Sequence, residues 1–183
     1  MEPSELVILD LCSGSGAWSK PYRDNGYKTI QVDLINGVDV RLFNPQGPVH
    51  GILAAPPCTI FAGSGARWWK EKGEAPLLEG LSMVDACLRI IYKTKPKFWA
   101  LENPVGRLIH YLGEPTLRFE PWHYGDPYTK YTLLWGQFNE PIPNYVNPTE
   151  GSKMHKMGPS PDRAAKRSET SSAFAQAFFE ANR

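Results

Sequence analysis

The sequence predicts an α/β protein built on a doubly wound, mostly parallel sheet. Short apolar segments that suit buried strands alternate along the chain with segments of helical spacing. Two of the apolar segments end in an acid, at Asp10 and Asp33, and a glycine-rich turn follows the first of them. In such sheets the functional residues gather at the carboxyl ends of the strands, so both acids lie in the predicted site region.

Five strands are predicted from short apolar runs bounded by turn residues. The first run is continuously apolar, as expected of a parallel strand that is buried on both faces. The third is stopped by Pro56 and Pro57. The predicted strands cover residues 6–10, 28–33, 50–55, 97–101 and 131–135.

Helices are predicted between and after these strands. One follows the glycine-rich turn, and a second, over 78–93, has apolar residues at helical spacing that should cover one face of the sheet. Pro104 is placed to begin a third. An amphipathic helix over 167–182, opened by Ser168 or Thr170, closes the chain. The segment 59–76 is expected to be a long loop rich in glycine, serine and tryptophan, and a proline-rich segment runs from Pro141 to Pro161.

Length and composition narrow the class of protein. We expect one domain over the 183 residues, and 42% hydrophobic with 21% charged residues argues against disorder. A formal charge of +1 excludes a general polycation but permits a local basic groove. No apolar stretch reaches the roughly 20 residues of a membrane span. Three scattered cysteines favour a reducing, cytoplasmic location and neither a disulfide scaffold nor a metal site.

The glycine-rich turn runs from Asp10 to Gly16. Gly14 and Gly16 allow the backbone to approach a ligand where a Cβ would collide. The spacing matches neither a dinucleotide fingerprint nor a phosphate-binding loop. A cationic cofactor with a ribose fits better, because Asp33 can accept from the ribose hydroxyls and Asp39 from an adenine amino group. The alternative is a tight turn whose glycines serve only packing.

A cysteine and a glutamate follow neighbouring strands. Cys58 stands on a rigid Pro-Pro platform after the third strand, where a thiolate could act as a nucleophile. Glu102 ends the next strand and should face the same rim, where it can act as an acid or hydrogen-bond partner toward a heterocycle. The alternatives are a buried structural cysteine, as expected for Cys87, and a glutamate that caps a helix.

In this order, the glycine-rich turn, the Pro-Pro-Cys loop and the Glu-Asn pair resemble the motifs of the cytosine-C5 methyltransferases. The resemblance spans residues 6 to about 136 and implies a single catalytic domain with the Rossmann-like fold of S-adenosylmethionine-dependent methyltransferases. It implies S-adenosylmethionine as the cofactor. The residues implied to bind it are Asp10, Cys12, Ser13, Gly14, Gly16, Trp18, Asp33, Leu34, Asp39 and Pro57.

The resemblance also implies a covalent mechanism on the base. Cys58 would add to carbon 6 of cytosine and make carbon 5 nucleophilic, while Glu102 would hold the protonated N3. Lys130 stands where the family has spaced arginines and is implied to be a third catalytic residue. Contacts to the substrate are expected for Phe61, Asn103 and Thr132 and, from the composition of their segment, for Arg67 and Trp68.

The expected partner is nucleic acid. The sequence is similar to compact phage and prophage enzymes, and DNA is the leading substrate. The large target-recognition region of the family has almost no room here, because only 137–167 is available, so RNA, single-stranded DNA or a nucleotide is the alternative. A third possibility is a catalytically weak cofactor-binding subunit that works with a specificity-providing protein.

Two basic segments suit contact with a nucleic acid. The segment 67–70 interleaves two tryptophans with an arginine and a lysine, which fits stacking on an unpaired base beside a phosphate. A basic stretch over 153–167 could touch a backbone. Ordinary loop packing and surface solvation are the alternatives for the two segments.

Overall fold

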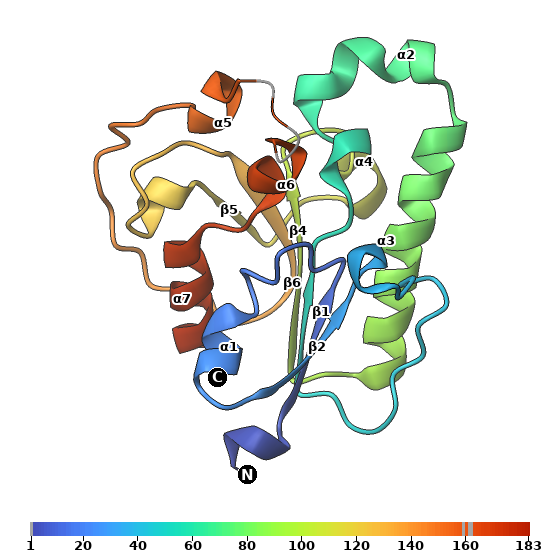
Figure 1. Ribbon diagram of the computed structural model, residues 1–183, viewed down its shortest axis with the longest axis vertical. Coiled ribbons are helices and arrows are strands. Elements are labelled where there is room, and N and C mark those ends of the chain that lie inside the picture. The colour runs from blue at the N-terminus through green and yellow to red at the C-terminus, as the bar shows by residue number, and fades with distance from the viewer. Residues whose placement is uncertain (1, 159, 161–162) are drawn as a thin grey trace.

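The computed structural model describes residues 2–158, 160 and 163–183, which surround a six-stranded sheet (Figure 1). The strands are β1 (Val7–Leu11), β2 (Lys28–Val32), β3 (Gly51–Ala54), β4 (Phe98–Pro104), β5 (Leu117–Phe119) and β6 (Thr132–Gln137). Their order is β2-β1-β3-β4-β6-β5, with the first four parallel and the last two joined through antiparallel pairs. The predicted α/β class with a mostly parallel sheet is therefore confirmed.

All five predicted strands are present, with ends displaced by at most three residues. The sequence analysis missed β5, because its three residues are too few to carry a periodic pattern. The helix predicted to begin at Pro104 is wrong, since Pro104 is the last residue of β4 and pairs with Thr132. An antiparallel partner from far along the chain thus prolongs β4 beyond its apolar run.

Helices cover both faces of the sheet (Figure 1). α3 (Ala75–Thr94) lies on one face and confirms the predicted 78–93 helix, whereas α1 (Lys20–Asp24) and α7 (Ser172–Ala181) lie on the other. Side chains of β1 alternate between the two layers, as strand geometry requires. Leu9 and Leu11 join the core cluster on the α3 side, while Ile8 joins the cluster that contains residues of α7.

The C-terminal segment forms two helices where one was predicted. α6 (Arg163–Ser168) is separated from α7, whose N-cap is Ser171 and neither Ser168 nor Thr170. The Ser171 hydroxyl accepts from the Phe174 backbone N–H at 3.2 Å and donates to a carboxylate oxygen of Asp126 at 2.6 Å. A tertiary partner for the cap therefore decides where the last helix starts.

The expected loop over 59–76 contains short helical turns. They are η3 (Cys58–Ile60), η4 (Gly63–Trp68) and α2 (Trp69–Lys72). Within 137–167, α5 (Lys153–Lys156) is the helix that precedes α6, and Pro159, Pro161 and Asp162 lie outside the described residues. The remaining short helices are η1 (Pro3–Glu5), η2 (Leu34–Asn36), α4 (Ile109–Leu112) and η5 (Pro121–His123).

None of the helices within 2–158 or 163–183 is long and apolar enough to cross a membrane.

Candidate functional site

A pocket lies where the strand order changes direction. Helical connections leave β1 and β3 toward opposite sides at this point, which is where α/β sheets bind ligands. The pocket has a volume of about 50 Å³ and is open to solvent. Five of the ten predicted cofactor residues line it together with neighbours from β2 and α3; the full lining is Cys12, Val32, Asp33, Leu34, Val38, Asp39, Val40, Pro57 and Met83.

The glycine-rich turn borders this pocket through Cys12. Gly14 has φ +51°, and a Cβ built on it would meet no atom within 4 Å, so space for a ligand is open there. The Asp33 carboxylate accepts from the backbone N–H groups of Gly14 and Ile35, each at 2.9 Å. The Ser13 hydroxyl is buried and has no hydrogen-bond partner among the described residues. The turn thus combines an open cradle with an unsatisfied polar group.

Gly16 has a different reason to be glycine. Its φ is +70°, and a Cβ on it would lie 1.6 Å from Nε2 of Gln31. The packing explanation that was left open for the turn therefore applies to Gly16, whereas Gly14 faces free space.

Two predicted cofactor residues brace the turn from behind and do not reach the pocket. Asp10 is buried and accepts a short hydrogen bond from Ser19, whose hydroxyl also accepts from Arg23 at 2.6 Å. Burial raises the pKa of Asp10 to about 7, against the lowering effects of Ser19 and Arg23. The Trp18 ring is 2% exposed and packs on Phe178 of α7. Both side chains are thus buried, Asp10 beside Ser19 and Trp18 against α7.

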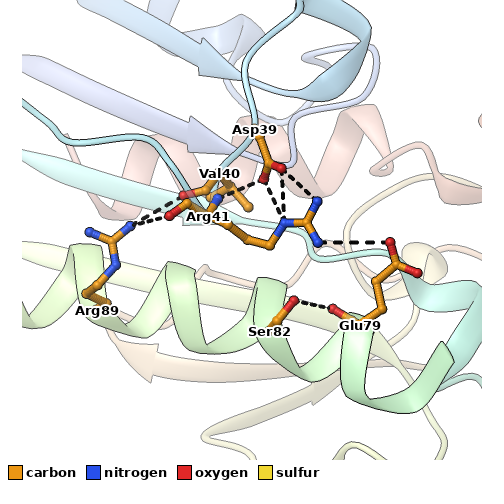
Figure 2. Close-up of polar contacts among 6 residues, drawn as sticks. All are labelled: Asp39, Val40, Arg41, Glu79, Ser82 and Arg89. Carbon is orange, nitrogen blue, oxygen red and sulfur yellow. Dashed lines mark hydrogen bonds and ion pairs between the residues drawn. The ribbon is translucent and has the colours of Figure 1, made fainter. Parts of the chain in front are cut away.

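Asp39 of the pocket lining belongs to a row of charged side chains, the clamp, that continues through Arg41 to Glu79 (Figure 2). The Asp39 carboxylate, the predicted acceptor for an adenine amino group, is held by the Arg41 guanidinium, with the shortest contact at 2.7 Å. The hydrogen bonds from Arg41 hold the pKa of Asp39 below its ordinary value. Arg41 in turn faces Glu79 of α3, at 4.0 Å. Asp39 therefore reaches the pocket with its orientation already fixed.

Cys58, Glu102 and Lys130 share one neighbourhood at the carboxyl ends of β3 and β4. Burial raises the pKa of the Cys58 thiol and the nearby Glu102 charge raises it further, whereas Lys130 and Arg167 lower it. Glu102 is buried, and burial raises the pKa of its carboxyl against the pull of Lys130. The Lys130 ammonium also donates to the backbone carbonyl of Glu169 at 2.9 Å. An acid, a thiol and two cations thus act on one another electrostatically.

Three predicted substrate residues are turned inward and hold the Cys58 loop in place. Phe61 is fully buried in the core, as expected of a large apolar ring. Asn103 is also fully buried, and its Nδ2 donates to the carbonyl of Pro56 at 2.9 Å. Thr132 is 2% exposed and donates to the carbonyl of Lys130. Their contacts in this structure are internal, so they position the loop and the lysine.

Arg67 and Trp68 remain at the surface. The Trp68 side chain is 46% exposed, and the Arg67 guanidinium lies 5.0 Å from its ring centroid. The next aromatic, Trp69, is covered by Arg107 at 4.5 Å, and Arg107 also donates to the carbonyl of Ile60 at 2.9 Å. The pair at 67–68 therefore offers an exposed aromatic and a cation, whereas Trp69 belongs to the packing of the loop.

Several residues near the site were not identified from sequence. Met83 and Val40 line the pocket, and Arg107 supports the Cys58 loop. Arg167 was noted only as part of a basic stretch, yet its charge reaches Cys58. No local pattern marks these positions, because each comes to the site through tertiary packing. Within the described part of the chain, no group of three or more acidic, histidine or cysteine side chains could hold a metal ion.

Comparisons with known proteins support the fold. No protein-family model matches the chain, and no curated protein matches it. Among solved structures, it is similar to a prophage-encoded E. coli protein described as a DNA modification methyltransferase, with 20% identity and a TM-score of 0.50 over 78% of this chain and 52% of that one. The chain thus spans about half the length of that protein.

Two further solved structures are similar at lower scores. The methyltransferase EhMeth of Entamoeba histolytica has 12% identity and a TM-score of 0.43, over 85% of this chain and 60% of that one. DhpI in complex with SAM and HEP has 12% identity and a TM-score of 0.34, over 79% and 65%. Sheet order and the first comparison together identify the Rossmann-like fold of S-adenosylmethionine-dependent methyltransferases.

Proposed function

We propose that this chain is a methyltransferase that transfers a methyl group from S-adenosylmethionine to carbon 5 of cytosine in DNA, through a covalent adduct on Cys58. One observation carries the proposal. Cys58 and Glu102 come from two different strand ends and lie close enough for the Glu102 charge to raise the pKa of the thiol. Pro57, the residue before the cysteine, lines the pocket assigned to the cofactor.

The residues around the pocket fit S-adenosylmethionine. Gly14 leaves open space at the turn, and the unpaired Ser13 hydroxyl can bond a polar group of the ligand. Asp33 and Asp39 supply acceptors for ribose and amino donors, and their negative charge suits a sulfonium. Val40 and Met83 provide apolar wall for a purine. When bound, this cofactor supplies an electrophilic methyl group.

Glu102 couples base binding to activation of Cys58. Burial raises the pKa of Glu102, which favours a protonated carboxyl that can donate to N3 of cytosine. While Glu102 holds this proton it is neutral, so the negative charge that raises the pKa of Cys58 is absent. Lys130 and Arg167, which lower this pKa, then favour the thiolate. The thiolate is thus generated beside the base, where it is needed.

The thiolate performs the addition and later leaves. The sulfur of Cys58 forms a bond to carbon 6, and the electron pair of the carbon 5–carbon 6 double bond moves to make carbon 5 nucleophilic while N3 takes the Glu102 proton. After carbon 5 has gained its methyl group, loss of the carbon-5 proton to a base restores the double bond and expels the thiolate, while N3 returns its proton to Glu102. Cys58 and Glu102 therefore return to their starting states.

Contact with nucleic acid is supported by the exposed surface beside the Cys58 loop. Trp68 offers a ring for stacking and Arg67 a charge for phosphate. Because stacking needs an unpaired base, these two residues also favour a second candidate substrate, single-stranded DNA or RNA. In a duplex, the target base must first be flipped out, at a cost of a few kcal/mol.

Trapping with a 5-fluorocytosine oligonucleotide tests the proposal. Fluorine cannot leave carbon 5 as a proton does, so an active enzyme supplied with S-adenosylmethionine should become covalently linked through Cys58. We expect a denaturation-resistant adduct with the wild type and with Cys87→Ala, a control at another buried cysteine, and none with Cys58→Ala. Full methyl transfer by Cys58→Ala would overturn the covalent mechanism.

The substrate class is decided by a matched panel. Labelled S-adenosylmethionine is offered with duplex DNA, single-stranded DNA and RNA of one sequence. Transfer to DNA supports the leading proposal, and transfer confined to RNA replaces it with the second candidate. If none is methylated while the cofactor still binds, the chain is better described as a cofactor-binding partner subunit.

A further inference from the structure

The orientation of Asp39 at the pocket wall is set by its neighbour Arg41. The oxygen Oδ1 accepts from the backbone N–H of Arg41 at 2.9 Å and from Nε at 3.0 Å. The oxygen Oδ2 accepts from Nε at 3.0 Å and from Nη2 at 2.7 Å. A planar guanidinium that presents its Nε–Nη2 edge to both oxygens of a carboxylate fixes the plane of that carboxylate. Asp39 is therefore locked in one orientation before any ligand arrives.

Helix α3 holds the clamp from the other side (Figure 2). Glu79 lies 4.0 Å from Nη1 of Arg41. Nearly three turns further along, Nη2 of Arg89 donates to the carbonyls of Arg41 and Phe43, at 3.3 and 3.1 Å. These bonds to backbone tie the segment 40–43 to the helix independently of the Arg41 side chain. Loss of that side chain should thus leave the Asp39 carboxylate held only through Oδ1 by the backbone N–H of residue 41, while the wall stays in place.

We infer that Arg41 is a positioning residue that makes the pocket selective for a purine carrying an amino group, by holding the Asp39 carboxylate ready to accept from it. The inference rests on the proposed binding of S-adenosylmethionine and adds a determinant of base selectivity. It follows from the position of Asp39 in the pocket lining combined with the clamp around it.

The selectivity has a simple electrostatic cause. The 6-amino group of adenine donates hydrogen bonds, whereas the 6-oxo group of hypoxanthine presents a lone pair to the carboxylate and is repelled. A carboxylate with a fixed orientation attracts the amino group and repels the oxo group at full strength. A carboxylate that can rotate toward solvent avoids the repulsion and loses part of the attraction, because it must be ordered again for each binding event. Removal of Arg41 should therefore reduce the difference in affinity between the adenine ligand and the hypoxanthine ligand.

The test compares two product-like probes by calorimetry: S-adenosylhomocysteine and its inosine counterpart, S-inosylhomocysteine. For the wild type we expect clear preference for the adenine probe. In Arg41→Ala the ratio of the two dissociation constants should fall by about tenfold, the equivalent of one charged hydrogen bond. Arg41→Lys keeps the charge but loses the planar guanidinium. Its ratio of dissociation constants should therefore lie between those of the wild type and Arg41→Ala.

Controls separate positioning from general damage. Arg89→Ala loosens the backbone of the wall, so it should weaken both probes alike and leave their ratio near the wild-type value. Arg118→Ala breaks an exposed pair with Glu114 on another part of the chain and should change neither affinity. A wild-type ratio in Arg41→Ala, or tighter binding of the adenine probe by that variant, would overturn the inference. Failure of the wild type to bind either probe would instead contradict the proposed cofactor.

Discussion

At the scale of single residues, the buried acid behind the glycine-rich turn gives the protein a pH-dependent stability. Burial raises the pKa of Asp10 from an ordinary value of 3.8 to about 7. The folded chain thus holds this proton more tightly than the unfolded chain does. The stabilisation is complete below the unfolded pKa and is lost as the pH rises toward the folded one.

We predict that replacement of this acid flattens the pH profile. Between about pH 5 and pH 8 the wild type should lose roughly 2–3 kcal/mol of free energy of unfolding that Asp10→Asn does not lose. Urea denaturation at several pH values measures the difference. Asp24→Asn, which changes an exposed carboxylate paired with Lys20, should keep the wild-type slope. Parallel profiles for the wild type and Asp10→Asn would contradict the assignment.

At the scale of elements, the start of α7 depends on one hydroxyl. Ser171 caps the helix and is itself held by Asp126. Ser171→Ala should lower the free energy of unfolding by about 1–2 kcal/mol, since it leaves the Phe174 N–H without its acceptor and removes one of the donors to Asp126. Thermal denaturation followed by circular dichroism checks this. Ser168→Ala is the control, because that exposed hydroxyl bonds only within its own helix, and an equal loss in both variants would refute the role of the cap.

The Cys58 loop is held against the segment after β4 by a close backbone approach. Gly106 forms a bridge with Ala62, and a Cβ on Gly106 would lie 1.9 Å from the carbonyl oxygen of Phe61. Gly106→Ala should therefore push the loop outward, cost about 1–3 kcal/mol of stability and speed proteolysis within 59–72. In the matched variant Gly63→Ala the nearest atom is 3.4 Å away, so a much smaller change is expected. Equal proteolysis of the two would count against this packing.

At the scale of the whole molecule, ligand binding at the strand ends should raise the free energy of unfolding of the entire protein. A ligand at about one hundred times its dissociation constant adds about 2.7 kcal/mol to the free energy of unfolding. For a chain of this size that corresponds to a rise in melting temperature of roughly 5–10 °C. S-adenosylhomocysteine should produce such a rise in a thermal-shift assay, and Asp33→Ala should reduce it, because Asp33 shapes both the pocket and the turn. No rise with the wild type would argue against the cofactor site.

Much of the architecture was predictable because strands and long helices carry local patterns. The apolar runs of β1 and β3 are buried throughout or nearly so, and the spacing in α3 identified both its range and the buried Cys87. Elements that depend on a distant partner were missed or misplaced. β5 is defined by pairing with β6, and the start of α7 by the hydroxyl of Ser171 with Asp126. Local periodicity contains no record of such partners.

The candidate site divides in the same way. The order of residues along the chain was sufficient to place Cys58, Glu102 and Asp33 at the carboxyl ends of parallel strands, since parallel strands end at one edge. The direction in which a side chain turns was decided by packing: Phe61 and Asn103 face the interior, while Arg167 comes to the cysteine from another helix. The sequence by itself determines which reactive residues follow which strands. The burial of those residues and the distances between their charges are decided only when distant segments pack together.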